Sequence, residues 1–138
     1  MQALTTLYNE LQKDSIFLES HKVIEHKAAT LRMDEDYAIF VDYNKIETLE
    51  DEFNVVVHEY GHCASGTTHK ICSPLDLISR HEYIANKYSV HKFLPFERYV
   101  EACKAGCNEC WEFAEYLDLP EKFVRLAHEM YVREGKLY

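Results

Sequence analysis

The stretch His58-Glu59-Tyr60-Gly61-His62 constrains this chain more than any other. It fits the pattern H-E-x-x-H, in which two histidines lie four residues apart with a glutamate after the first. On an α-helix such histidines fall within about 40° of each other, one turn apart, so both imidazoles can reach one metal ion. Glu59 projects at a neighbouring angle, where it can touch a water on that ion. The competing interpretation is two solvated histidines on an amphipathic helix.

The motif lies in a segment with the pattern of an amphipathic helix over residues 48–64. Thr48 followed by Asp51 resembles a capping box and predicts a helix start near residue 48. Gly61 costs roughly 1 kcal/mol of helix propensity, which indicates a close neighbour or an open path beside it. The side opposite the histidines carries Leu49, Phe53, Val56, Val57, Tyr60 and Ala64. We therefore expect this face to be buried and the imidazoles to point elsewhere.

A second helix is predicted to supply a third ligand. Ser73-Pro74 has the composition of a helix start, and Pro95 should stop the helix near Leu94. Glu82 shares a mostly apolar face with Leu75, Ile78, Ala85, Ser89 and Phe93. A buried carboxylate needs a cation or strong hydrogen-bond donors. A metal held by the two histidines is our prediction, with an Arg or Lys partner as the rival. Weaker candidate ligands are His81, Asp76, His69 and His91.

Before the motif, the pattern predicts one helix and a small antiparallel sheet. Leu4, Leu7, Tyr8 and Leu11 have helical spacing over residues 3–13. Residues 16–18 and 23–24 read as short strands. The period-two pattern within residues 28–43 predicts a β-hairpin with an acidic turn at Asp34-Glu35-Asp36. The fold class expected is α+β.

The last forty residues read as helices. Helices are predicted at 109–117 and 121–133, joined by a turn at Asp118-Leu119-Pro120, in a helix-turn-helix-like arrangement. Acidic residues offset the basic ones on the second helix, so we expect it to pack on the core or to dock a protein rather than read DNA. Cys103, Cys107 and Cys110 could bind a metal or cluster, but buried free thiols are the commoner reading.

Composition narrows the class of protein. The chain has 138 residues, 47% of them hydrophobic, which suits one compact domain. A net charge of −9 argues against a phosphate-binding or nucleic-acid-binding surface. Five cysteines without an export signal predict free thiols in the cytoplasm, and no stretch resembles a membrane span.

Two motifs together carry a resemblance to a known family. His58-Glu59-Tyr60-Gly61-His62 is followed by Glu82-Tyr83-Ile84-Ala85-Asn86-Lys87-Tyr88 and then by Phe93-Leu94-Pro95. This order resembles the ImmA/IrrE family of metallopeptidases, with its HExxH helix and its E-x-x-A-N-x-aromatic helix that ends in Leu-Pro. Ile84 stands where an acid is common, and Ser89-Val90 replaces a more usual small-residue start, but neither is a proposed ligand.

The resemblance implies an intracellular zinc endopeptidase of prophages and mobile elements that cleaves a helix-turn-helix repressor. His58, His62 and Glu82 would be the zinc ligands and Glu59 the general base, acting on a metal-activated water. Mn²⁺ and Fe²⁺ suit the same ligands. Tyr60, Tyr83 and His81 are candidate oxyanion donors. The resemblance also implies a zincin-like core over residues 1–95, with the C-terminal helical segment 96–138 packed on it.

Two other functions stay open at this point. One is a non-catalytic antirepressor that uses zinc to hold its fold and sequesters its target. The other is a DNA-binding regulator built on the C-terminal helices, against which the charge of −9 weighs. Substitution of Glu59 would distinguish the antirepressor from a peptidase, because only a peptidase needs a general base.

Overall fold

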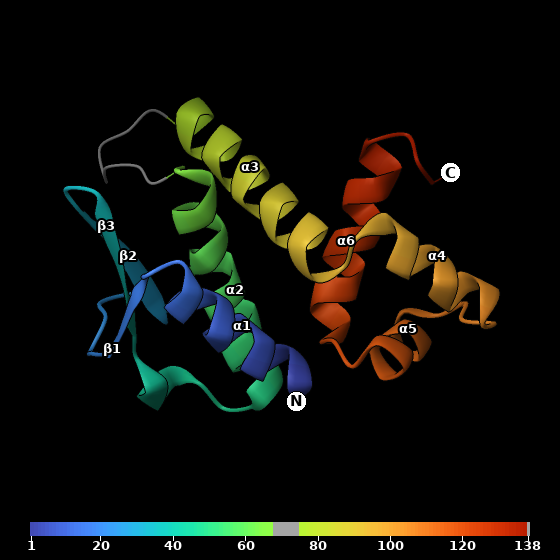
Figure 1. Ribbon diagram of the computed structural model, residues 1–138, viewed down its shortest axis with the longest axis horizontal. Coiled ribbons are helices and arrows are strands. Elements are labelled where there is room, and N and C mark those ends of the chain that lie inside the picture. The colour runs from blue at the N-terminus through green and yellow to red at the C-terminus, as the bar shows by residue number, and fades with distance from the viewer. Residues whose placement is uncertain (68–74, 138) are drawn as a thin grey trace.

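The computed structural model describes residues 1–67 and 75–137 (Figure 1). Within them the chain forms a mixed α+β fold of six α-helices and one three-stranded sheet. In chain order the elements are α1 (Gln2–Lys13), β1 (Phe17–Ser20), β2 (Ala28–Met33), β3 (Asp36–Val41), the 3-10 turn η1 (Tyr43–Lys45), α2 (Leu49–Ser65), α3 (Leu75–Phe93), α4 (Phe96–Lys104), α5 (Cys110–Leu117) and α6 (Glu121–Arg133). None of the helices in these residues is long and apolar enough to cross a membrane.

The sheet has the strand order β1-β3-β2 and is mixed. β2 and β3 form the predicted antiparallel hairpin, with Thr30 opposite Ile39. β1 runs parallel to β3, so the prediction of a purely antiparallel sheet is wrong for this strand. The predicted strand at 23–24 is also wrong, because Lys45 donates hydrogen bonds to the carbonyls of Val23 and His26 and holds this segment as a loop.

Helix α2 begins where its cap predicts. The Thr48 side chain accepts a hydrogen bond from the Asp51 amide at 3.0 Å, which satisfies one of the free N–H groups of the first turn. Phe53, Val56 and Tyr60 are fully buried, as the helical pattern predicts. Leu49, in the first turn, is instead 52% exposed. The apolar face thus enters the core one turn after the helix begins.

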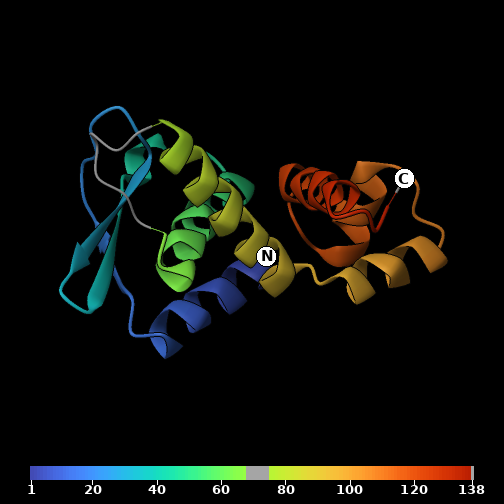
Figure 2. The ribbon, with the colours of Figure 1, turned by 90° about the horizontal axis from the view of Figure 1, so that it is seen from above.

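Helices α2 and α3 lie side by side at unusually close range around Gly61 (Figures 1 and 2). A Cβ atom at Gly61 would lie 2.5 Å from the carbonyl oxygen of Ala85, which is closer than real contacts allow. The Ser89 hydroxyl donates a hydrogen bond to the Val57 carbonyl at 3.0 Å across the same crossing. The close neighbour expected at Gly61 is therefore the backbone of α3.

The C-terminal helices extend the same hydrophobic core. The ring of Phe53 on α2 makes edge contacts with Phe93 on α3 and Phe123 on α6, at centroid distances of 5.8 and 5.3 Å. The Tyr131 hydroxyl of α6 donates to the Leu94 carbonyl at 2.6 Å. Figure 2 shows the sheet and helices α4–α6 at opposite ends, with α1–α3 between them. Helix α6 thus packs against α3 and against the buried Phe53 ring of α2.

Candidate metal centre and cleft

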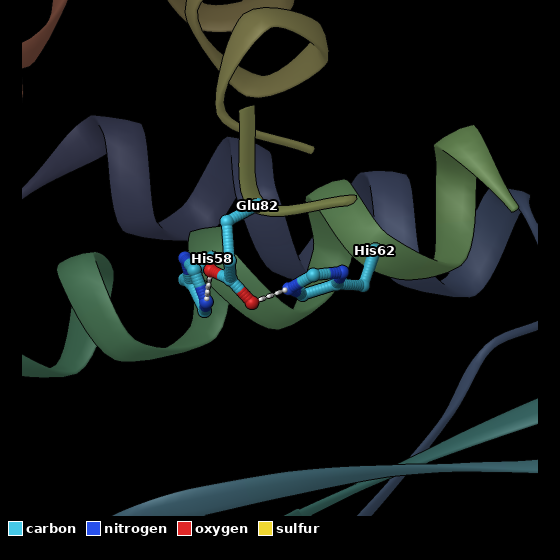
Figure 3. Close-up of side chains that lie close together, drawn as sticks. All are labelled: His58, His62 and Glu82. Atoms are coloured by element: carbon cyan, nitrogen blue, oxygen red, sulfur yellow. Dashed lines mark ion pairs between the residues drawn. The ribbon is translucent and has the colours of Figure 1, made fainter. Parts of the chain in front are cut away.

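Three potential metal ligands converge between α2 and α3 (Figure 3). His58 Nε2 lies 2.9 Å from Oε2 of Glu82, and His62 Nε2 lies 2.9 Å from Oε1, the other oxygen of the same carboxylate. One donor atom from each of the three residues lies within 4.8 Å of the others. In the described part of the chain no other group of three such side chains comes together in this way.

The end of α2 orients His62. Gly66 adopts a left-handed conformation with φ +69°, which ends the helix and turns the chain back over its last turn. The Thr67 amide then donates to the His62 carbonyl, and the Thr67 carbonyl lies 3.0 Å from His62 Nδ1. A carbonyl only accepts, so Nδ1 carries a proton, and this contact turns the ring so that Nε2 faces the Glu82 carboxylate. Metal-binding histidines are commonly held in this way.

His58 is oriented by two residues of α3. Its imidazole is hydrogen-bonded to Glu82 and to the side chain of Asn86, one helical turn further on. The hydrogen bond with Glu82 raises the pKa of His58 above its ordinary value, although burial opposes the shift. The hydrogen bonds from His58 and His62 hold the pKa of the Glu82 carboxyl well below its ordinary range. Glu82 is therefore a carboxylate at neutral pH, the form that binds a metal.

The arrangement fits a divalent ion of the zinc type. Two imidazole nitrogens and one carboxylate oxygen form a known catalytic ligand set, and such ligands lie roughly 3.3 Å apart in a tetrahedron. The 2.9 Å spacings to Glu82 are close to this value. The Glu82 side chain is 36% exposed rather than buried as predicted, because its carboxylate faces the opening between the helices. The three residues could therefore hold a metal ion that remains open to a further ligand.

The carboxylate of Glu59 lies at the same opening and is held from the sheet. The Thr30 hydroxyl on β2 donates a short hydrogen bond to Glu59 Oε2. Thr30 lies on the outer strand of the described sheet, since β2 pairs with β3 alone. Cys63, beside Thr30 and one turn from Glu59, has its pKa raised to about 12 by burial. The thiol is therefore neutral, and Glu59, unlike Cys63, lines the opening.

A cleft of about 840 Å³ surrounds these side chains. One wall is the segment 26–30, the floor is formed by α2 and α3, and the opposite wall is α6. The α6 wall carries Lys122, Arg125, Leu126 and Glu129, which are spaced as one helical face. Two basic residues of the helix-turn-helix-like segment, Lys122 and Arg125, thus line the same cleft as the candidate metal ligands.

The three candidate oxyanion donors do not line this cleft. The Tyr60 hydroxyl donates to Asp14 at 3.0 Å on the far side of α2. The Tyr83 ring stacks under the guanidinium of Arg133, 4.6 Å from the ring centroid. His81 is on α3 immediately before Glu82 but is not among the lining residues. These three predictions are not supported by the geometry.

The structure places His91, one of the weaker ligand candidates, outside the triad. His91 forms an ion pair with Glu134 at 2.9 Å and lies against the Tyr131 ring, away from the triad. His69 and the predicted Ser73-Pro74 cap lie outside the described residues, as does the side chain of Asp76. Cys103, Cys107 and Cys110 are free and do not converge, because Gly106, at φ +100°, ends the run that carries them as a helix.

The sequence pattern missed Thr30, Thr67 and the α6 wall. Gly66 after the last turn of α2 is the one local signal that could have pointed to Thr67, because such a glycine turns the chain back over the helix end. Contact between Thr30 and Glu59 joins residues 29 positions apart and has no signature in the sequence. Searches of protein-family models, curated proteins and solved structures find no match to this chain.

Proposed function

We propose that this chain is a zinc-dependent endopeptidase of the ImmA/IrrE type with a zincin-like core formed by α2, α3 and the sheet. The observation that carries the proposal is the convergence of His58, His62 and Glu82 in one cleft with the Glu59 carboxylate. Each part alone is common in proteins. A two-histidine, one-carboxylate ligand set beside a second carboxylate is the arrangement used for metal-assisted peptide hydrolysis.

The proposed roles follow from the chemistry of the side chains. Bound to His58, His62 and Glu82, a zinc ion would polarise a peptide carbonyl and lower the pKa of water. Glu59 would accept a proton from the attacking water and pass it to the leaving amine nitrogen, so that the peptide C–N bond breaks with no net change in protons. Thr30 would hold the Glu59 carboxylate during both transfers.

The proposed substrate is a cytoplasmic regulatory protein, a helix-turn-helix repressor of a prophage or mobile element. The support is the resemblance of the His58–His62 and Glu82–Pro95 motifs to the ImmA/IrrE family. The size of the cleft and its two opposed walls suit a peptide segment that contacts both segment 26–30 and α6. The charge of −9 makes nucleic acid a poor ligand for the same surface.

The test measures metal and cleavage in the same samples. The zinc-loaded chain is incubated with a peptide library made from a bacterial proteome, and new termini are identified by mass spectrometry. We expect cleavage by the wild type, loss of cleavage after chelation, and recovery with zinc. The Glu59→Gln variant should keep one zinc per chain and lose cleavage by at least about 100-fold, the scale of a missing general base.

Two outcomes would contradict the proposal. Cleavage by Glu59→Gln at the wild-type rate would show that Glu59 is not the base. The second outcome is that the wild type and Glu59→Gln relieve repression in cells equally well and no repressor fragments appear on a gel. This result would identify a sequestering antirepressor instead.

A further inference from the structure

The outward face of α5 carries two exposed aromatic side chains. Trp111 is 55% exposed and Tyr116 is 56% exposed, although aromatic residues are usually well covered. Phe113 and Leu117, on the inward face of the same helix, are buried in the core. Packing of α5 therefore does not require the outward rings. Helical spacing places Trp111, Glu112, Glu115 and Tyr116 together on this outward face, which we call the α5 face.

A hollow of about 470 Å³ lies at the α5 face. Its remaining wall is the connection from α4, formed by Ala105, Gly106 and Cys107. No atom lies within 4 Å of the position a Cβ would take at Gly106, so the wall is low and the hollow is open. None of these residues lines the cleft around the metal triad. The two concave regions are separate.

The hollow is acidic. It is lined by Glu112 and Glu115 and by no basic residue. Glu112 uses one carboxylate oxygen to cap its own helix at the amides of Asn108 and Glu109. Glu115 is exposed and makes no hydrogen bond or ion pair with any of the residues that the structure describes. A carboxylate between two exposed aromatic rings is therefore available to a cation from another molecule.

We propose that the α5 face is a docking surface for a basic peptide segment of a partner protein. Arg and Lys side chains stack on aromatic rings and pair with carboxylates, and Trp and Tyr are the residues that most often dominate protein interfaces. A second copy of this chain is a poor occupant because it also carries a net charge of −9. Nucleic acid is repelled for the same reason. The inference does not depend on the proposed hydrolysis.

Trp111 is the single tryptophan of the chain, so its fluorescence reports on this surface directly. The probe is a synthetic peptide of alternating arginine and glycine, with an alternating glutamate and glycine peptide as the control. We expect a saturable change in emission with the arginine peptide alone, at physiological ionic strength. Calorimetry with the Trp111→Ala variant should show binding weakened by at least about tenfold, as expected for an aromatic anchor.

The matched variants separate a specific surface from general attraction to an acidic protein. Glu115→Lys should weaken binding at least about tenfold, while Glu19→Lys makes the same charge change on exposed β1, at the other end of the molecule (Figure 1), and should weaken it less than about twofold. Equal weakening by both variants, or no saturable emission change, would overturn the proposal. Concentration-dependent self-association that Trp111→Ala abolishes would also overturn it, in favour of a dimer contact.

Discussion

His58 and His62 lie four residues apart on α2, and Cys103 and Cys107 have the same spacing in the C-terminal segment, yet only the histidines share one unbroken helix. α4 ends at Lys104, so Cys107 falls in the turn that follows. The histidine pair is also crossed by a second helix, which brings Glu82 to within 2.9 Å of each ring. Ligand spacing becomes a site only where the helix continues and a neighbouring element supplies the third ligand.

The largest effect is expected from removing a ligand. His58→Ala should weaken zinc binding by at least about 100-fold, because loss of a direct ligand exceeds the 10–100-fold cost of losing a supporting contact. His91→Ala is the matched control, since both histidine side chains are 37% exposed and both pair with a glutamate. Competition with a zinc-binding dye measures both affinities. Equal zinc affinities in the two variants would show that His58 contributes no more to zinc binding than a histidine in an ordinary ion pair.

Gly61→Ala tests the helix crossing that delivers Glu82. The new methyl group would overlap the Ala85 carbonyl, and this overlap should outweigh the roughly 1 kcal/mol gained in helix propensity. We expect the free energy of unfolding in urea to fall by about 2 kcal/mol, with weaker zinc binding as α3 moves away. An unchanged or higher stability would mean that the two helices do not meet at Gly61.

Thr30→Val tests the contact between the sheet and Glu59. It removes the hydroxyl that donates to the carboxylate while keeping the shape of the side chain. In the peptide-library assay we expect turnover to fall by about tenfold, the lower end of the cost of losing a supporting hydrogen bond, with zinc affinity unchanged. Thr30→Ser, which keeps the hydroxyl, should restore turnover. A fall in zinc affinity equal to the fall in turnover would indicate that Thr30 only supports the fold of the site.

The smallest effect is expected at the cysteines. A variant with Cys103, Cys107 and Cys110 all replaced by serine should bind one zinc per chain with wild-type affinity, because these thiols do not converge. Elemental analysis of the dialysed protein measures the stoichiometry. A loss of zinc from this variant would contradict the comparison, because the cysteine segment rather than the histidine pair would then hold the metal.

Local signals predicted the elements that depend on one segment of chain. The Thr48 cap placed the start of α2, and the pattern over 121–133 matches α6. The helical wheel placed Glu82 on the face of α3 that meets α2, where Ala85 and Ser89 are buried. Each of these predictions depends on helical periodicity alone.

Features that depend on distant contacts could not be predicted. The parallel direction of β1 is set by how residues 21–27 cross the molecule, and Lys45 and Asp42 hold that segment through its backbone. The cleft that Glu82 lines depends on the position of α6, which forms its far wall. Contacts between distant segments of this kind leave no periodic pattern in the sequence of either segment.

The central claim, that zinc binds at His58, His62 and Glu82, is tested most directly by X-ray absorption at the zinc edge. The sample is the full chain loaded with one equivalent of zinc. The account predicts nitrogen and oxygen ligands at about 2.0–2.1 Å, with an imidazole scattering pattern and no sulfur. A sulfur shell at about 2.3 Å would contradict it, because the metal would then lie at cysteines.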